Sequence, residues 1–120
     1  MWPNERDCLL AERILEDIET VEQRIAYFGL TAESFCNDHS FEGEIAYDAV
    51  MNPVYRIVED ACHLSDEFMS LNESFAWREM KGFRNFVAHG YGAINRTIAW
   101  GVIKRHLPEL KHMLVVLLDE

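Results

Sequence analysis

Apolar residues recur at steps of three and four positions along most of the chain, the pattern of a helix with one buried face. In residues 5–28 they form a single stripe, and glutamate and arginine occupy the opposite face. Gly29 is a natural end for this helix, and Thr31 is a natural N-cap for a short helix that ends near residue 38. The chain is therefore expected to begin with a long amphipathic helix and a short one.

Helical spacing continues through residues 41–71, with one disturbance at Asn52-Pro53. Proline removes one backbone hydrogen bond and clashes with the preceding turn, so we expect one long helix with a kink near residue 50. Two helices broken at this point are the alternative. The single helix is favoured because the apolar spacing resumes without a polar loop-like cluster.

Two more helices are expected in the second half of the chain. Ser74 is a plausible N-cap for a helix over residues 75–88, which the glycines at 90 and 92 should end. Asn95 should cap the last helix, and Pro108 should kink it.

The helical pattern predicts the fold class. No stretch alternates apolar and polar residues for long enough to form a strand, and no Asn-Gly hairpin signal occurs. Hydrophobic residues make up 49% of the chain and charged residues 27%, a composition typical of globular domains. We therefore expect a single all-α domain over residues 1–120, an antiparallel four-helix-type bundle with one short additional helix.

Charge is unevenly distributed along the chain. The net charge is −10; residues 1–70 carry 4 basic and 16 acidic side chains, and residues 71–120 carry 7 and 5. An acidic protein is a poor nonspecific binder of nucleic acid, so DNA is not expected as a partner. The mildly basic second half permits a local phosphate-contacting patch, and a solvated surface of mixed charge is the alternative.

Cysteine usage and hydropathy indicate a cytoplasmic protein. The three cysteines are far apart and form no Cys-x-x-Cys motif, so neither a zinc site nor a disulfide framework is suggested. The N-terminus lacks the basic and apolar regions of a signal peptide. The longest apolar run, residues 113–118, is far shorter than the roughly 20 residues that span a membrane. No metal or other cofactor is expected.

The densest group of chemically capable side chains lies at residues 84–91, Arg-Asn-Phe-Val-Ala-His-Gly-Tyr. Arg84 and His89 are five residues apart, which is about 140° around a regular helix. They therefore share a site only if the helix unwinds at Gly90 or if two copies of the motif meet across a two-fold axis. We favour the second arrangement acting together with the first.

This group has the chemistry of a metal-free RNA-cleaving site. Arg84 can hold a phosphate by two parallel hydrogen bonds, and His89, at a helix end that favours its cationic form, can transfer protons. Asn85 could orient His89 or a phosphate, and the Tyr91 hydroxyl could contact a nucleotide or be modified. The alternative is the end of a bundle helix with polar residues facing water. Elsewhere, Glu59 and Asp60 are interpreted as a solvated helix face.

Several motifs together resemble the HepT-like toxins of the HEPN superfamily. The segments that carry the resemblance are Arg84-x4-His89-x-Tyr91, Trp77, Ala88-His89-Gly90-Tyr91, Trp100, Leu107-Pro108-x-Leu110, and Ile57-Val58-Glu59 with Leu64-Ser65. The chain departs from the family pattern at Val58, where glycine is common, and at Asn95, where aspartate is usual.

The resemblance implies a helical homodimer that joins through its motif-bearing helices. It implies the toxin of a toxin–antitoxin system, a metal-independent endoribonuclease that acts on RNA through Arg84 and His89. The implied partner is an MntA-like nucleotidyltransferase antitoxin that transfers AMP from ATP to Tyr91, where the added phosphates would block the site. The alternative is a non-catalytic helical subunit that binds substrate for, or serves as a scaffold to, a minimal nucleotidyltransferase.

Overall fold

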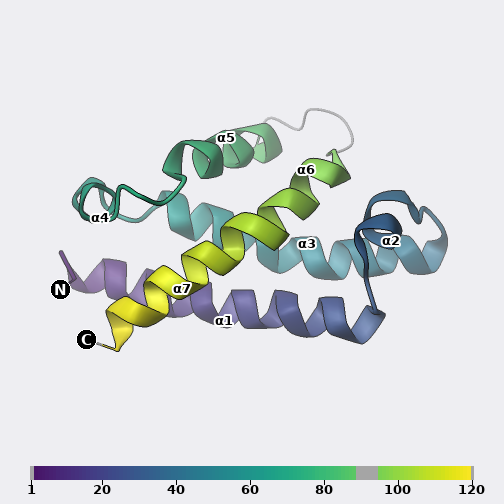
Figure 1. Ribbon diagram of the computed structural model, residues 1–120, viewed down its shortest axis with the longest axis horizontal. Helices are drawn as coiled ribbons and strands as arrows, with labels where there is room; N and C mark the ends of the chain where they lie inside the picture. The colour runs from purple at the N-terminus through teal and green to yellow at the C-terminus, as the bar shows by residue number, and fades with distance from the viewer. Residues whose placement is uncertain (1, 89–94, 120) are drawn as a thin grey trace.

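The structure is a computed structural model in which residues 2–88 and 95–119 are described (Figure 1). These residues contain helices and no strands, so the all-α class is confirmed for the described part of the chain. In chain order the elements are α1 (Glu5–Phe28), α2 (Ala32–Asn37), α3 (Phe41–Cys62), α4 (Asp66–Leu71), α5 (Trp77–Ala88), α6 (Arg96–Gly101), the π-helical η1 (Val102–His106) and α7 (Leu107–Leu118).

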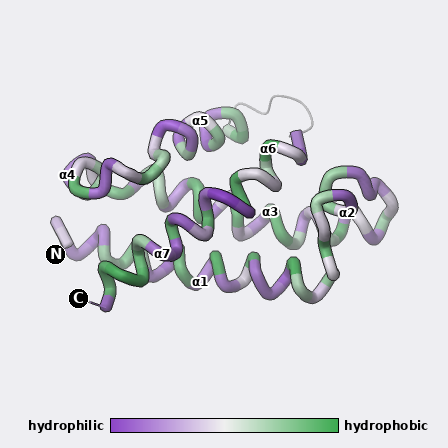
Figure 2. Tube along the Cα trace, viewed as in Figure 1, coloured by the Kyte–Doolittle hydropathy of each residue, from purple (hydrophilic) through white to green (hydrophobic). Residues whose placement is uncertain are grey.

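Helices α1 and α3 form the largest packed pair and run antiparallel along the long axis of the molecule (Figure 1). Helix α5 packs on α3, α7 crosses α1, and the short α2 covers α6 and part of α3. Figure 2 shows hydrophobic and hydrophilic residues alternating along α1, as expected for one buried stripe. The fully buried side chains come from several elements and include Ile14, Ile18, Phe35, Val54, Ile57, Phe68, Met80, Leu110 and Leu114.

The first two helices agree with the sequence pattern. Gly29 follows α1 with a φ of 60°, in the left-handed region that glycine adopts without strain. Thr31 caps α2: its hydroxyl accepts a hydrogen bond from the Ser34 backbone N–H, and the Ser34 hydroxyl pairs in return with the Thr31 backbone N–H. Both predicted boundary signals are therefore confirmed.

The expected long helix over residues 41–71 is wrong beyond residue 62. Pro53 lies inside the continuous α3, so the alternative break at that proline is also wrong. The chain instead breaks after Cys62, and Ser65 caps the separate helix α4 by accepting from the Phe68 N–H at 3.1 Å. Apolar spacing continues across this break, which is why periodicity alone did not reveal it.

A buried carboxylate on α1 holds this break in place. Asp7 is only 1% exposed, and it accepts hydrogen bonds from the Ser65 backbone N–H at 2.8 Å and from the Ser65 hydroxyl at 2.6 Å. The two residues are 58 positions apart, so the bonds join the start of α1 to the start of α4.

In the second half of the chain, the observed helix boundaries differ by a few residues from the predicted ones. The expected cap at Ser74 is wrong: α5 begins at Trp77, after a turn in which the Phe75 N–H and the Trp77 indole N–H both donate to the Asn72 carbonyl. Asn95 caps α6 as expected, accepting from two backbone N–H groups.

Before Pro108 the backbone adopts a π turn, in which the Leu107 N–H donates to the Val102 carbonyl. This wider turn accommodates a proline ring that would clash in an α-helix.

We predict that Asp7→Ala lowers the free energy of unfolding by about 2–4 kcal/mol, because two charge-assisted bonds are lost and a buried donor is left unpaired. Urea unfolding followed by circular dichroism measures the change. The matched control is Glu16→Ala, which removes an exposed carboxylate from the same helix and should cost at most about 0.5 kcal/mol. Equal unfolding midpoints for the two variants would show that the Asp7 tether does not stabilise the fold.

Candidate active site at the end of α5

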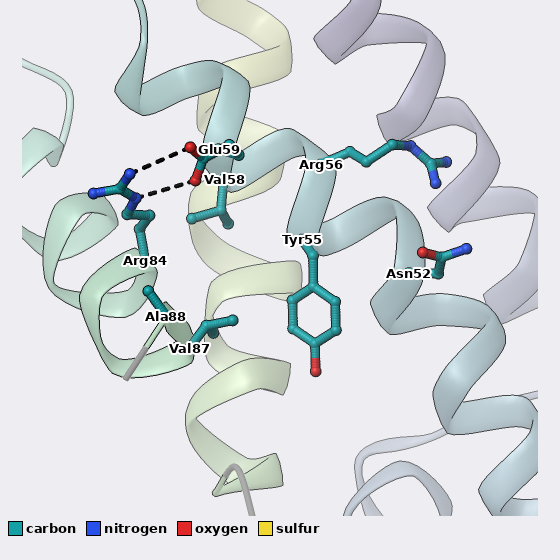
Figure 3. Close-up of a pocket in the computed structure, with 8 residues that line it drawn as sticks. All are labelled: Asn52, Tyr55, Arg56, Val58, Glu59, Arg84, Val87 and Ala88. Atoms are coloured by element: carbon teal, nitrogen blue, oxygen red, sulfur yellow. Dashed lines mark hydrogen bonds and ion pairs between the residues drawn. The ribbon is translucent and has the colours of Figure 1, made fainter. Parts of the chain in front are cut away.

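Arg84 lies one turn before the end of α5 and is paired with Glu59 of α3 (Figure 3). Its Nε and Nη2 atoms donate to the two carboxylate oxygens at 3.1 and 3.2 Å, a bidentate arrangement. The hydrogen bond from Arg84 lowers the pKa of the Glu59 carboxyl, and the same bond raises the pKa of Arg84. Both side chains remain partly exposed, at 39% and 49%, so the pair is accessible from solvent.

The expectation of a solvated helix face holds for Glu59, which is exposed although paired, and is wrong for Asp60, which is buried. Glu59 also contacts His63, whose Nδ1 lies 3.5 Å from its carboxylate and 2.7 Å from its backbone carbonyl. Asp60 is buried and accepts a hydrogen bond from Arg13 at 3.0 Å. Burial raises the pKa of the Asp60 carboxyl, and the Arg13 charge opposes this shift.

A cavity of about 330 Å³ opens beside the Arg84–Glu59 pair, between α3 and α5. Figure 3 shows Tyr55 and Val58 extending from α3, with Val87 and Ala88 at the end of α5 beside them. The full lining is Asn52, Tyr55, Arg56, Val58, Glu59, Arg84, Val87 and Ala88. The arginine singled out from the sequence thus lies at the edge of a real cavity.

The structure places some of the predicted site residues and leaves others out. Arg84 and Asn85 are both on α5, with Asn85 exposed. His89 and Tyr91, together with Gly90, lie outside the described residues, so their expected positions remain predictions. The last described residue before them, Ala88, lines the cavity and directly precedes His89 in the chain.

The helix that follows residues 89–94 is also anchored to α3. Arg96 donates two hydrogen bonds to Glu44, at 2.7 and 2.8 Å, and its guanidinium carbon lies 3.8 Å from the centre of the Tyr47 ring. Burial raises the pKa of Tyr47 to about 12, and its interactions with Tyr55 add to this shift. No local sequence signal marks Arg96 as part of the site, because its partners lie some fifty positions away in the chain.

Basic side chains in the second half of the chain form ion pairs with acidic side chains in the first half. Besides the pairs of Arg84 and Arg96, Lys111 of α7 pairs with Glu22 of α1 at 3.0 Å. Phosphate binding by these cations would therefore require sharing them with carboxylates. Within residues 2–88 and 95–119 there is no group of three or more His, Cys, Asp or Glu side chains suited to a metal ion. No described helix is both long and apolar enough to cross a membrane.

Comparison with known proteins identifies relatives of this chain. It is 27% identical over 109 residues to a protein of Caldanaerobacter subterraneus subsp. tengcongensis that is named as a candidate RNase, a match covering 91% of each chain. It is also 27% identical over 100 residues to a Thermococcus cleftensis protein named probable ribonuclease HepT, covering 83% of this chain and 84% of that one. No solved structure matches.

The family model described as ribonuclease HepT-like matches residues 13–117, a span that includes α3, α5 and the cavity between them. The resemblance inferred from the motif at residues 84–91 is thereby confirmed. The chain belongs to the HepT-like ribonuclease family.

Proposed function

We propose that this protein is the toxin of a toxin–antitoxin pair and a metal-independent endoribonuclease that uses Arg84 and His89. The observation that carries the proposal is the position of Arg84. Its guanidinium is partly exposed at the edge of a cavity, on the helix that leads directly into His89. Membership of the ribonuclease HepT-like family and the names of the two relatives support the same activity.

The proposed reaction is an in-line attack within RNA. The 2′-oxygen forms a bond to the neighbouring phosphorus while the bond to the 5′-oxygen breaks, leaving a 2′,3′-cyclic phosphate and a free 5′-hydroxyl. His89 transfers one of the two protons, either by accepting the one that leaves the 2′-hydroxyl or by donating the one that reaches the 5′-oxygen, and solvent water exchanges the other. Arg84 stabilises the charge on the phosphate oxygens in the transition state, and Asn85 supports their orientation. DNA lacks the 2′-hydroxyl and cannot react in this way.

In this mechanism Glu59 holds the Arg84 guanidinium in one orientation. It engages Nε and Nη2, and Figure 3 shows the third guanidinium nitrogen pointing away from the carboxylate. A guanidinium has five N–H donors, so one edge can be held by the carboxylate while the remaining donors face a phosphate. Pre-orientation lowers the entropy lost when RNA binds.

Two further parts of the proposal follow from the family resemblance and the spacing of the motif. We propose a homodimer in which two copies of the segment around Arg84 and His89 form one composite site. We also propose a nucleotidyltransferase antitoxin that attaches AMP to Tyr91, whose phosphates would compete with RNA for Arg84. We propose that both proteins of the pair act in the cytoplasm, where RNA and ATP are available.

We predict that Arg84→Ala and His89→Ala each reduce RNA cleavage by the purified protein about 100-fold or more, the usual effect of removing one such group. Cleavage of total tRNA on denaturing gels and growth after induced expression are the measurements. Lys81→Ala is the control, since it removes an exposed positive charge one turn earlier on α5. Growth arrest that persists in both variants would contradict the proposal, and intact RNA with the unmodified protein would favour the non-catalytic scaffold.

We predict that the Glu59 carboxyl titrates below its ordinary value of 4.5 and returns toward that value in Arg84→Ala. A carboxylate with a lowered pKa keeps its partner until the pH falls through that pKa, so the pair is intact at neutral pH. Carboxyl NMR titration measures the shift, and Lys81→Ala should leave it unchanged. An identical Glu59 titration in the Arg84 variant would mean that the pair does not form in solution.

We predict that incubation with the partner nucleotidyltransferase and ATP adds mass to the chain in steps of one AMP. Intact-mass spectrometry detects the addition, and RNA cleavage should fall as the modified fraction rises. Tyr91→Phe removes the accepting hydroxyl and is the matched control. Modification that proceeds equally in Tyr91→Phe would move the acceptor to another residue.

A further inference from the structure

We propose that the cavity between α3 and α5 binds one unpaired nucleobase of the RNA, with Tyr55 as its stacking surface. This inference rests on the proposed function, because it places the base next to a phosphate held by Arg84. It goes further by identifying a part of the protein that contacts the substrate away from the reacting atoms.

The size and lining of the cavity suit a single nucleobase. Its volume of about 330 Å³ lies at the lower end of the roughly 300–1,000 Å³ range of small-molecule sites. Val58 and Val87 supply apolar lining from the two facing helices, and Figure 3 shows the Tyr55 ring extending from α3 beside them. An aromatic ring beside aliphatic side chains is the usual surroundings of a base taken out of a strand.

The Tyr55 hydroxyl is linked to a connected group of side chains. The Tyr55 phenol interacts with the Tyr47 hydroxyl, Arg96 lies over the Tyr47 ring at 3.8 Å, and Glu44 holds Arg96 by two hydrogen bonds. Tyr55 is half-buried and is therefore restricted before any ligand arrives. A ring that is already fixed loses little entropy when a base stacks on it.

The polar groups around the cavity favour a nucleotide over an apolar peptide. Arg84 lies at one edge, where it can contact the phosphate that joins the base to the next nucleotide. Asn52, which is exposed, adds a carboxamide that can both donate to and accept from a base edge. An apolar side chain in this space would form no hydrogen bond with either group.

The position of the cavity along the chain is also consistent with a nucleotide site. Ala88 lines the cavity and directly precedes His89, so the cavity adjoins the point where the proposed proton-transfer residue enters. Neighbouring nucleotides of a single strand can place one phosphate at Arg84 and one base against Tyr55.

The test measures binding of a fluorescently labelled single-stranded RNA with 2′-O-methyl riboses, which cannot be cleaved because the attacking hydroxyl is blocked. Loss of one base–aromatic stack should weaken binding by Tyr55→Ala roughly 5- to 100-fold in fluorescence anisotropy. Tyr55→Phe keeps the ring and loses only the hydroxyl that meets Tyr47, so it should bind much more tightly than Tyr55→Ala. Tyr27→Ala, which removes a tyrosine that is 83% exposed on α1, should bind normally.

A scan with abasic nucleotides on the unmodified protein identifies which base is bound. Replacing the bases one at a time should reveal one position whose loss weakens binding as much as Tyr55→Ala does, and that loss should vanish in the Tyr55→Ala protein. Val87→Phe, which fills the cavity from the opposite helix, should mimic the abasic probe. Circular dichroism checks the fold of each variant, and the scan on the unmodified protein decides the matter if a variant does not fold.

The outcomes separate this inference from the proposed function. Equal binding at every abasic position, or by Tyr55→Ala and Tyr27→Ala, would overturn the base site even if the protein cleaves RNA. Tyr55-dependent binding without any cleavage of unmodified RNA would overturn the nuclease and leave the base site standing. A cavity that instead accepts a side chain of a second copy would appear as loss of the dimer in Val87→Phe with unchanged RNA affinity, which also overturns the base site.

Discussion

The packing of α3 against α1 is the constraint on which the rest of this structure depends. Apolar side chains such as Ile14, Ile18, Val54 and Ile57 fill the seam, and each fully buried one contributes about 1.5–3 kcal/mol. Once that face of α3 is fixed inward, helix geometry directs its remaining faces toward α5, α6 and solvent. Glu59 can then meet Arg84, and α3 becomes the common support for both helices that flank residues 89–94.

Sequence periodicity predicted most of the helices because burial of one face leaves a regular trace in the chain. It failed where a tertiary contact decides the outcome. The apolar positions Leu64 and Phe68 continue the spacing across the break at residues 63–65. There Ser65 caps α4 and is also bonded to the buried Asp7 carboxylate, 58 positions away. Local patterns carry no information about such a distant partner.

The candidate site was predictable in a similar, partial way. Arg84 stood out because its neighbours at residues 84–91 are unusually rich in chemically capable groups, and the same segment carried the family resemblance that the comparison confirms. Its partner Glu59 and the aromatic wall at Tyr55 could not be identified, since each is an ordinary residue on an amphipathic helix until the fold brings α5 alongside. The uneven charge along the chain is evident from the sequence, but the ion pairs that join its acidic and basic halves are not.

The π turn at Val102–His106 has a consequence for the rotational phase of the last helices. The buried residues Ala99, Ile103, Leu107, Leu110 and Leu114 advance fifteen positions in four steps. At 100° per residue, an ideal α-helix would carry this stripe about 60° around its axis. The wider turn absorbs part of that drift, so one apolar edge faces the core on both sides of Pro108. The π turn before Pro108 thereby helps to set the rotation of α6 about its axis, and with it the direction in which Arg96 projects.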